Sequence, residues 1–521
     1  MKKLATLLIA AGLVFSMAPS ANAVDFKAKG NWMMDFEVGN NGGFTNNTGY
    51  SGDDNFEAKQ RVRLWVDAVA SENLSGQVFF EIGTTTWGKA EHSGALGADD
   101  TCIKVRRAFI DWMIPETDIK VRMGIQGFGL PSFTMGKSQI FEDDVAGVTV
   151  STKFTDNVGL SVFWLRPYND NYASGDSGKG QDKSNFMDNV DVFGLTVPLS
   201  FDGVKVTPYG LIAAIGPNAL SADKAYGTLM NSSGDFSKSN LGTSWAQMRN
   251  GLLPAWGYIS NSGRTLEGVV QDEYATAWFA GVTADITVAD PFRVAIDVMG
   301  GGTNWSESRM NRAGWMAAAL VEYKMDFGIP GIIGWYSSGD DDDLGNGSER
   351  MPYLTVGNGD NSFSNYAFDG GKYLAREATI ANTMAGTWGV GLRVKDMSFL
   401  ENLKHTFRLN LIGGTNDSGV LKKIYRQQAL ATNPSFSSVN SASYGVGGLY
   451  MTEEDYALEI GLENTYKMYE NFKICLDANY IAMWMSDSKY GGVKKQLSGK
   501  NGNSSDVRDA WNISVNFAYE F

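Results

Sequence analysis

The stretch Trp511-Asn512-Ile513-Ser514-Val515-Asn516-Phe517-Ala518-Tyr519-Glu520-Phe521 alternates strictly between apolar and polar side chains. Successive side chains of a β-strand point to opposite faces, so this pattern predicts a strand with one apolar and one wet face. The chain then stops on an aromatic residue. Such an ending is typical of the strand that closes a bacterial outer-membrane β-barrel against lipid, with Phe517, Tyr519 and Phe521 as its signature.

The other end of the chain predicts export. Lys2 and Lys3 form a short basic region, the stretch 4–17 is largely apolar, and Ala21-Asn22-Ala23 resembles the small-residue cleavage site of a secretory signal peptide. The apolar stretch is too short for a transmembrane helix. We therefore predict a signal peptide at residues 1–23 and a single barrel domain at residues 24–521, located in the outer membrane.

Amphipathic stretches of about ten residues, the length of a tilted transmembrane strand, recur along the chain. In the second of them, Phe56, Ala58, Val62 and Leu64 alternate with polar residues. The connections alternate between tight turns and long Gly/Ser/Asn/Asp-rich segments, as expected for short periplasmic turns and long external loops. The long segments lie near 39–55, 87–102, 127–146, 169–188, 216–273, 339–383 and 415–453. This pattern predicts an all-β, antiparallel transmembrane barrel of 18 strands, with 16 as the alternative.

At this point the sequence resembles the general diffusion porins, and more specifically the homotrimeric outer-membrane porins of sulfate-reducing bacteria. The resemblance rests on the signal peptide and on the segments Phe26–Phe36, Ala58–Leu64, Val121–Gln126 and Phe517–Phe521. It implies a homotrimer of separate barrels, and a third external loop that folds back into each lumen. That loop would be the segment from Gly127 to Gly147.

A barrel of sixteen or more strands leaves a water-filled lumen, whose selectivity depends on the charges at its narrowest point. From the alternation of faces we expect basic residues on the wall and acidic residues on the infolded loop. The predicted constriction residues are Arg61, Arg63, Arg107, Lys120, Arg122, Glu142, Asp143 and Asp144. A register slip of one residue would put Arg106 in place of Arg107.

Other partners are limited by composition. A net charge of −14 argues against nucleic acid. The expected partners are outer-membrane lipid and lipopolysaccharide, the barrel-assembly machinery through the C-terminal strand, and small hydrophilic solutes. No cofactor or metal site is predicted, although calcium at the loop acids 340–343 is an open alternative. Cys102 and Cys475 are expected towards opposite ends of the barrel, which argues against a disulfide.

Four functions are compatible with an exported barrel of this kind. The preferred hypothesis is a channel for passive diffusion of ions and small hydrophilic solutes. The first alternative is a channel selective for small anions such as sulfate, phosphate or organic acids, using the lumenal arginines. An outer-membrane hydrolase is disfavoured because His92 and His405, the two histidines, fall in separate regions and lack an evident nucleophile. The fourth function is an adhesin that binds partners through its loops. Because the hydrolase is disfavoured, we do not expect an enzyme.

Overall fold

The computed structural model describes residues 24–40, 55–90, 94–97, 103–169, 189–217, 219–220, 241–255, 273–356, 363–368, 374, 379–420, 423, 449–486 and 509–521. The predicted signal peptide, His92 and Cys102 lie outside the described residues. Within the described part of the chain, no helix is both long and apolar enough to cross a bilayer.

The described elements are almost all strands. They are β1 (Asp25–Gly39), β2 (Asn55–Ser71), β3 (Leu74–Thr86), β4 (Ile103–Met113), β5 (Lys120–Gly129), β6 (Phe141–Thr155), β7 (Val158–Asn169), β8 (Asn189–Thr196), β9 (Leu199–Phe201), β10 (Val204–Ile215), α3 (Leu241–Leu252), β11 (Ala275–Ile286), β12 (Phe292–Asn304), η4 (Ser308–Met310), β13 (Arg312–Tyr323), β14 (Ile329–Ser337), β15 (Thr355–Val356), β16 (Thr387–Leu400), β17 (Leu403–Gly414), β18 (Tyr456–Tyr469), β19 (Phe472–Trp484) and β20 (Ala510–Glu520).

The strands form one closed barrel. Each wall strand pairs antiparallel with its chain neighbours, and β20 pairs with β1, with Trp32 opposite Tyr519. The terminal residue completes the closure: the Phe521 amide donates to the Gly30 carbonyl (2.9 Å), and the Gly30 amide donates to the Phe521 carbonyl (2.7 Å). The aromatic C-terminus predicted to close the barrel does so.

The wall contains eighteen strands, as predicted. β8 and β9 are two parts of one strand, interrupted at Val197-Pro198, because proline has no amide hydrogen for the ladder. β15 is not part of the wall: it is a two-residue strand that pairs parallel with the start of β6. The sixteen-strand alternative is therefore wrong.

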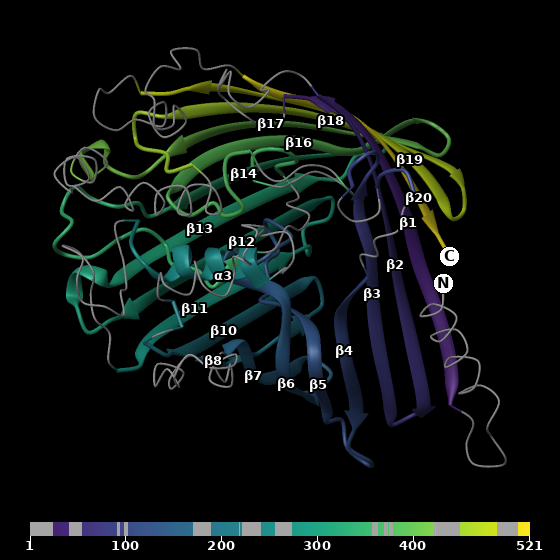
Figure 1. The fold of residues 1–521 in the computed structure, drawn as a ribbon, viewed down its shortest axis with the longest axis horizontal. Helices are drawn as coiled ribbons and strands as arrows, with labels where there is room; N and C mark the ends of the chain where they lie inside the picture. The colour runs from purple at the N-terminus through teal and green to yellow at the C-terminus, as the bar shows by residue number, and fades with distance from the viewer. Residues whose placement is uncertain are drawn as a thin grey trace.

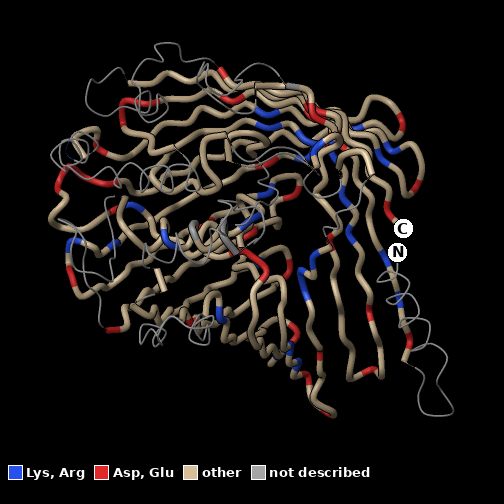
Figure 2. The backbone as a smooth tube through the Cα atoms, in the orientation of Figure 1, with Lys and Arg blue, Asp and Glu red and all other residues tan. Residues whose placement is uncertain are grey.

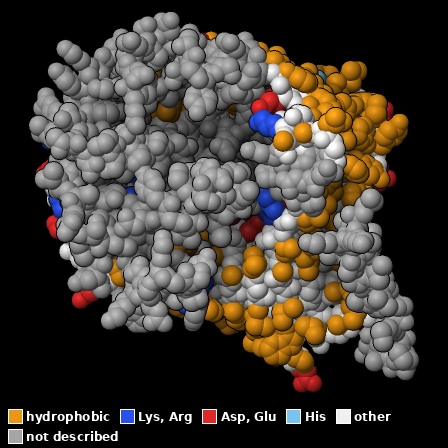
Figure 3. All heavy atoms as spheres, in the orientation of Figure 1, with side chains coloured by type: hydrophobic (Ala, Val, Ile, Leu, Met, Phe, Trp, Pro, Cys, Tyr) orange, Lys and Arg blue, Asp and Glu red, His pale blue; other side chains and the backbone are white. Residues whose placement is uncertain are grey.

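The outer face of the barrel is apolar. Exposed apolar residues occur on the outward side of the wall strands, including Ile110, Ile212, Trp278, Val298 and Ile513, each between 43% and 59% exposed. Figure 3 shows hydrophobic side chains gathered over the outer surface near the strands that close the barrel. An exposed apolar belt of this kind is what a barrel presents to lipid.

The interior is divided into two unlike halves. Many inward side chains of β7–β14 belong to a large apolar cluster and are at most 5% exposed, including Phe163, Leu165, Tyr209, Phe279, Leu320 and Ile333. Charged exceptions on β12 and β13 are Arg293, Asp297 and Glu322. Residues of the loops fill the space in front of them, and α3 lies inside the ring of strands (Figure 1). Charged side chains form ion pairs on β2–β6 and between β16–β18 and their neighbours. Figure 2 marks where the basic and acidic residues lie along the backbone.

Candidate functional site

The third external loop, here called loop 3 (residues 130–140 between β5 and β6), folds into the lumen as the sequence predicted. Its tip reaches β12, where Asp297 accepts hydrogen bonds from the Ser132 hydroxyl (2.6 Å) and the Thr134 amide (3.1 Å). β12 lies far from β5 and β6 in the order of strands around the barrel. Loop 3 therefore crosses the lumen and narrows it.

Two further loops pack onto loop 3 inside the barrel. In loop 7 (residues 338–386), the Leu354 amide donates to the Ile140 carbonyl (2.8 Å) and the Phe368 carbonyl accepts from Lys137 Nζ (3.0 Å). In loop 5 (residues 216–274), α3 contacts loop 7 where the Tyr353 amide donates to the Gly251 carbonyl (3.1 Å). The sequence identified both segments as long external loops but did not place them in the lumen.

Basic side chains from β2 and β4 surround two carboxylates, Glu81 and Asp144, on the β2–β6 side of the barrel interior. Glu81 of β3 pairs with Arg63 (2.9 Å) and Arg106 (3.2 Å), and Asp144 of β6 pairs with Arg106 (2.6 Å) and Arg107 (2.5 Å). Arg61 lies 4.0 Å from Glu81. The four arginine side chains are 15–35% exposed, so solvent reaches them, unlike the apolar half of the interior. We call these four arginines the arginine cluster.

A β-bulge explains why both Arg106 and Arg107 belong to the arginine cluster. Phe79 pairs with Arg107 and the next residue, Phe80, pairs with Val105, so Arg106 is the extra residue on β4. A bulge breaks the alternation of faces locally, and neighbouring side chains can then point to the same side. The sequence analysis predicted Arg107 in the constriction, or Arg106 in its place after a register slip. In the structure both residues contact Asp144.

The three predicted loop acids are in a strand. Glu142, Asp143 and Asp144 belong to β6 and not to the infolded loop, because β5 and β6 continue past the expected ends of the strands. Glu142 accepts from the Ser138 amide (2.9 Å), and Asp143 accepts from Ser244 of loop 5 (2.6 Å). Of the three, Asp144 is the one that faces the arginine cluster.

Lys120 and Arg122 lie apart from the arginine cluster. Both lie at the start of β5, close to the short connection from β4. Both pair with Asp111, Lys120 at 2.9 Å and Arg122 at 2.7 Å. The Arg122 guanidinium also lies over the ring of Phe109, 4.1 Å from its centroid. They line the wall at its periplasmic end.

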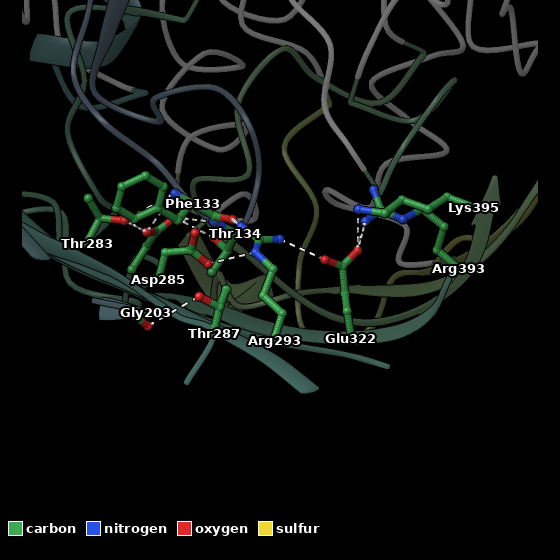
Figure 4. Close-up of polar contacts among 11 residues, drawn as sticks. Phe133, Thr134, Gly203, Thr283, Asp285, Thr287, Arg293, Glu322, Arg393 and Lys395 are labelled. Atoms are coloured by element: carbon green, nitrogen blue, oxygen red, sulfur yellow. Dashed lines mark hydrogen bonds and ion pairs between the residues drawn. The ribbon is translucent and has the colours of Figure 1, made fainter. Parts of the chain in front are cut away.

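A second charged cluster, which the sequence analysis did not predict, lies on β12–β16 (Figure 4). Glu322 of β13 accepts from Arg293 (2.8 Å), Arg393 (2.5 Å) and Lys395 (2.7 Å). Arg293 also pairs with Asp285 (2.6 Å) and donates to the Phe133 carbonyl of loop 3 (3.0 Å). This cluster therefore connects the wall to loop 3.

The alternation of faces contained a signal for this second cluster. Arg393 and Arg408 sit at inward positions of β16 and β17 and are direct cross-strand neighbours. Like charges placed opposite each other are unfavourable unless acids lie close by. Glu322 and Glu463 supply them, with Glu463 at 3.1 Å from Arg408.

Among the described residues, no group of three or more His, Cys, Asp or Glu side chains is arranged to hold a metal ion. In the acidic stretch 340–343, Asp340 is buried and accepts from Ser348 and Tyr450, and also from the Arg350 amide (3.2 Å). Calcium binding at this stretch stays the open alternative that it was from the sequence. His405 Nδ1 lies 2.6 Å from Asn464 Oδ1.

No protein-family model matches this sequence, and no curated protein matches it. Solved structures do match the fold. OccAB3 of Acinetobacter baumannii has a TM-score of 0.50 at 10% identity, over 95% of this chain and 99% of that chain. OccK5 (OpdH) of Pseudomonas aeruginosa has a TM-score of 0.47 at 12% identity, over 95% of this chain and 98% of that chain. At these identities the likeness shows the fold alone. With its closed ring of eighteen strands and its apolar outer belt, the chain has the architecture of a porin and is a multi-pass β-barrel of the outer membrane.

Proposed function

We propose that this porin passes small hydrophilic solutes by passive diffusion, and that its passage favours small anions such as carboxylates, phosphate or sulfate. One observation carries the proposal: in the arginine cluster, four guanidinium groups share two carboxylates, Glu81 and Asp144. The local charge is therefore positive although the whole chain has a net charge of −14.

The physical argument follows from burial. Apolar side chains fill much of the β7–β14 side of the lumen, whereas the arginine cluster on the β2–β6 wall is partly exposed, so we place the passage along that wall. Charges between low-dielectric walls act more strongly than in bulk water and raise the local concentration of the opposite ion. A permeating anion would exchange contacts between successive guanidinium groups, which bind carboxylate and phosphate oxygens in pairs.

The assembly of the protein belongs to the same proposal. We infer that residues 1–23 are removed as a signal peptide and that the mature chain forms a homotrimer, like the porins of sulfate-reducing bacteria that the sequence resembles. The C-terminal strand would be recognised by the barrel-assembly machinery, and the external loops would contact lipopolysaccharide. No catalytic step is part of this function.

The test is electrical. Protein purified from outer membranes would be inserted into planar bilayers, and the reversal potential measured across a potassium chloride gradient. We expect conducting channels with chloride favoured over potassium. Arg106→Gln combined with Arg107→Gln should shift the reversal potential towards cation preference, and Asp144→Asn should shift it the other way. Arg122→Gln, near the periplasmic end and beside Lys120 and Asp111, is the matched control with a smaller expected shift.

Other results would contradict parts of this proposal. Channels without ion preference, unaffected by the arginine substitutions, would leave an unselective diffusion pore. Correctly folded protein that never conducts would exclude the diffusion function and favour a plugged barrel or an adhesin.

A further inference from the structure

A buried aromatic ring, that of Phe79, lies beneath the arginine cluster. Phe79 of β3 is 2% exposed, and the guanidinium carbons of Arg63, Arg106 and Arg107 lie 5.9, 5.6 and 5.5 Å from its ring centroid. Trp65, its cross-strand neighbour on β2, stacks on Phe79 with centroids 4.5 Å apart and planes 7° apart. Three cations thus share one ring whose position is fixed by a second ring.

An aromatic ring and a carboxylate both attract a cation, but they differ in how much of its charge they cancel. A carboxylate attracts a guanidinium and cancels its charge. The face of an aromatic ring attracts the same cation through its quadrupole and carries no net charge. With Phe79 in their midst, Arg63, Arg106 and Arg107 gain an additional attractive partner, while their charge remains available to a passing anion.

The bulge on β4 makes this arrangement possible. Arg107 is the direct cross-strand neighbour of Phe79, and the extra residue Arg106 lies over the same ring. In a regular strand the side chains of residues 106 and 107 would point to opposite faces, and one of them would meet lipid.

Gly127 of β5 leaves the space that the Arg107 guanidinium occupies. A Cβ atom added at Gly127 of β5 would lie 2.4 Å from Arg107 Cζ, 2.6 Å from Nη2 and 2.8 Å from Nη1. The guanidinium therefore lies against the β5 backbone in space that any side chain at residue 127 would occupy. Because the clash involves the end of a flexible side chain, Gly127→Ala should displace the guanidinium and leave the strand in place.

We propose that Phe79 and Gly127 are the positioning residues that set the anion selectivity of the passage. Phe79, supported by Trp65, holds three guanidinium groups together without neutralising them, and Gly127 gives Arg107 its place. The ligand class is a small carboxylate or inorganic anion. This inference rests on the proposed function, since it concerns how the same arginine cluster acts on anions.

The test compares substitutions that change no charge. Phe79→Leu keeps an apolar side chain of similar size and removes the ring, so the chloride-to-potassium permeability ratio should fall about two- to fivefold. Phe79→Tyr keeps the ring and should retain the ratio. Gly127→Ala should lower the ratio to a similar extent by moving Arg107. Phe279→Leu is the control, since Phe279 is equally buried, at 1%, but lies in the apolar half of the interior.

The outcomes separate this inference from the proposed function. If folded Phe79→Leu and Gly127→Ala keep the parent ratio while the Arg106/Arg107 double substitution loses it, the positioning role is wrong and the proposed function stands. If the double substitution also changes nothing, the proposed function fails. If Phe79→Leu does not fold, the ratio measured for Gly127→Ala decides.

Discussion

Arg293 and Asp297, four residues apart on β12, hydrogen-bond the backbone carbonyl and amide of Phe133 in loop 3. Arg293 donates to the Phe133 carbonyl (3.0 Å), and Asp297 accepts from the Phe133 amide (3.2 Å). The two side chains share the inward face of β12, because positions four apart on a strand point the same way. The tip of the constricting loop is therefore clamped to the opposite wall by charged groups.

We expect Asp297→Ala to release the tip of loop 3. Hydrogen bonds to a charged group contribute about 1.5–3 kcal/mol each, and Asp297 accepts several from residues 132–134. Single-channel conductance should increase and become noisier, and amides of residues 130–140 should exchange faster with deuterium. Asp202→Asn, in an exposed periplasmic turn, is the control; unchanged conductance in Asp297→Ala would show that the clamp does not set the pore width.

Glu322→Gln should destabilise the barrel and increase its preference for anions. The change leaves Arg393, whose side chain is 5% exposed, without its carboxylate partner, and breaking a buried ion pair costs about 3–5 kcal/mol. Unfolding by urea in detergent micelles measures the first effect and the reversal potential the second. The double substitution Glu322→Gln with Arg393→Gln should recover part of the stability; no recovery would argue that the pair is not coupled.

Glu459→Ala should detach part of loop 7 from the wall. Glu459 is fully buried and accepts from three successive amides, those of Asn365 (2.9 Å), Tyr366 (2.8 Å) and Ala367 (3.1 Å). Without the carboxylate these donors lose their partner, so proteases should cleave loop 7 faster and conductance should rise. Glu470→Gln, in the exposed turn between β18 and β19, should behave like the parent. Equal cleavage rates in the two variants would be evidence against the anchoring role.

Charge placed on the outer face should cost more than charge in the lumen. Val298 of β12 is 44% exposed on the apolar belt, so Val298→Arg should lower the free energy of unfolding by about 2–4 kcal/mol if it lies near the bilayer midplane. Thr149→Arg on β6 faces the interior, where Thr149 hydrogen-bonds Gln126 (3.2 Å), and should cost less. Unfolding in lipid vesicles measures both; equal losses would mean that the faces are wrongly assigned.

Ionisation of Glu349 in loop 7 should weaken the loop as the pH rises. Burial raises the pKa of Glu349, and the neighbouring Asp341 and Asp340 charges raise it further, above its ordinary value of 4.5. The folded state then binds more protons than the unfolded state, so stability decreases as pH rises from about 4.5 through the folded pKa. Glu349→Gln should remove this dependence. Hydrogen exchange of residues 338–356 at several pH values checks it, and an unchanged pH profile in the variant would assign the effect elsewhere.

The wall of the barrel could be predicted from the sequence because it depends on local alternation. Lipid on one side and an interior on the other impose a period of two on every strand, and this pattern predicted eighteen strands and the closing residues Phe517, Tyr519 and Phe521. The position of the infolded loop came from the resemblance to porins together with this strand order.

The sequence by itself thus determined the barrel, its faces and the inward direction of Arg61 and Arg63, all properties of single strands. The tertiary structure decided the rest of the site: which carboxylates pair with which arginines, the bulge that adds Arg106, the ring of Phe79 beneath them, and the entry of loops 5 and 7 into the lumen. The physical reason is distance along the chain. Asp144 meets Arg106 only because β4 and β6 lie on either side of β5, and Asp297 meets Phe133 only because loop 3 crosses the barrel. Local alternation relates neither pair.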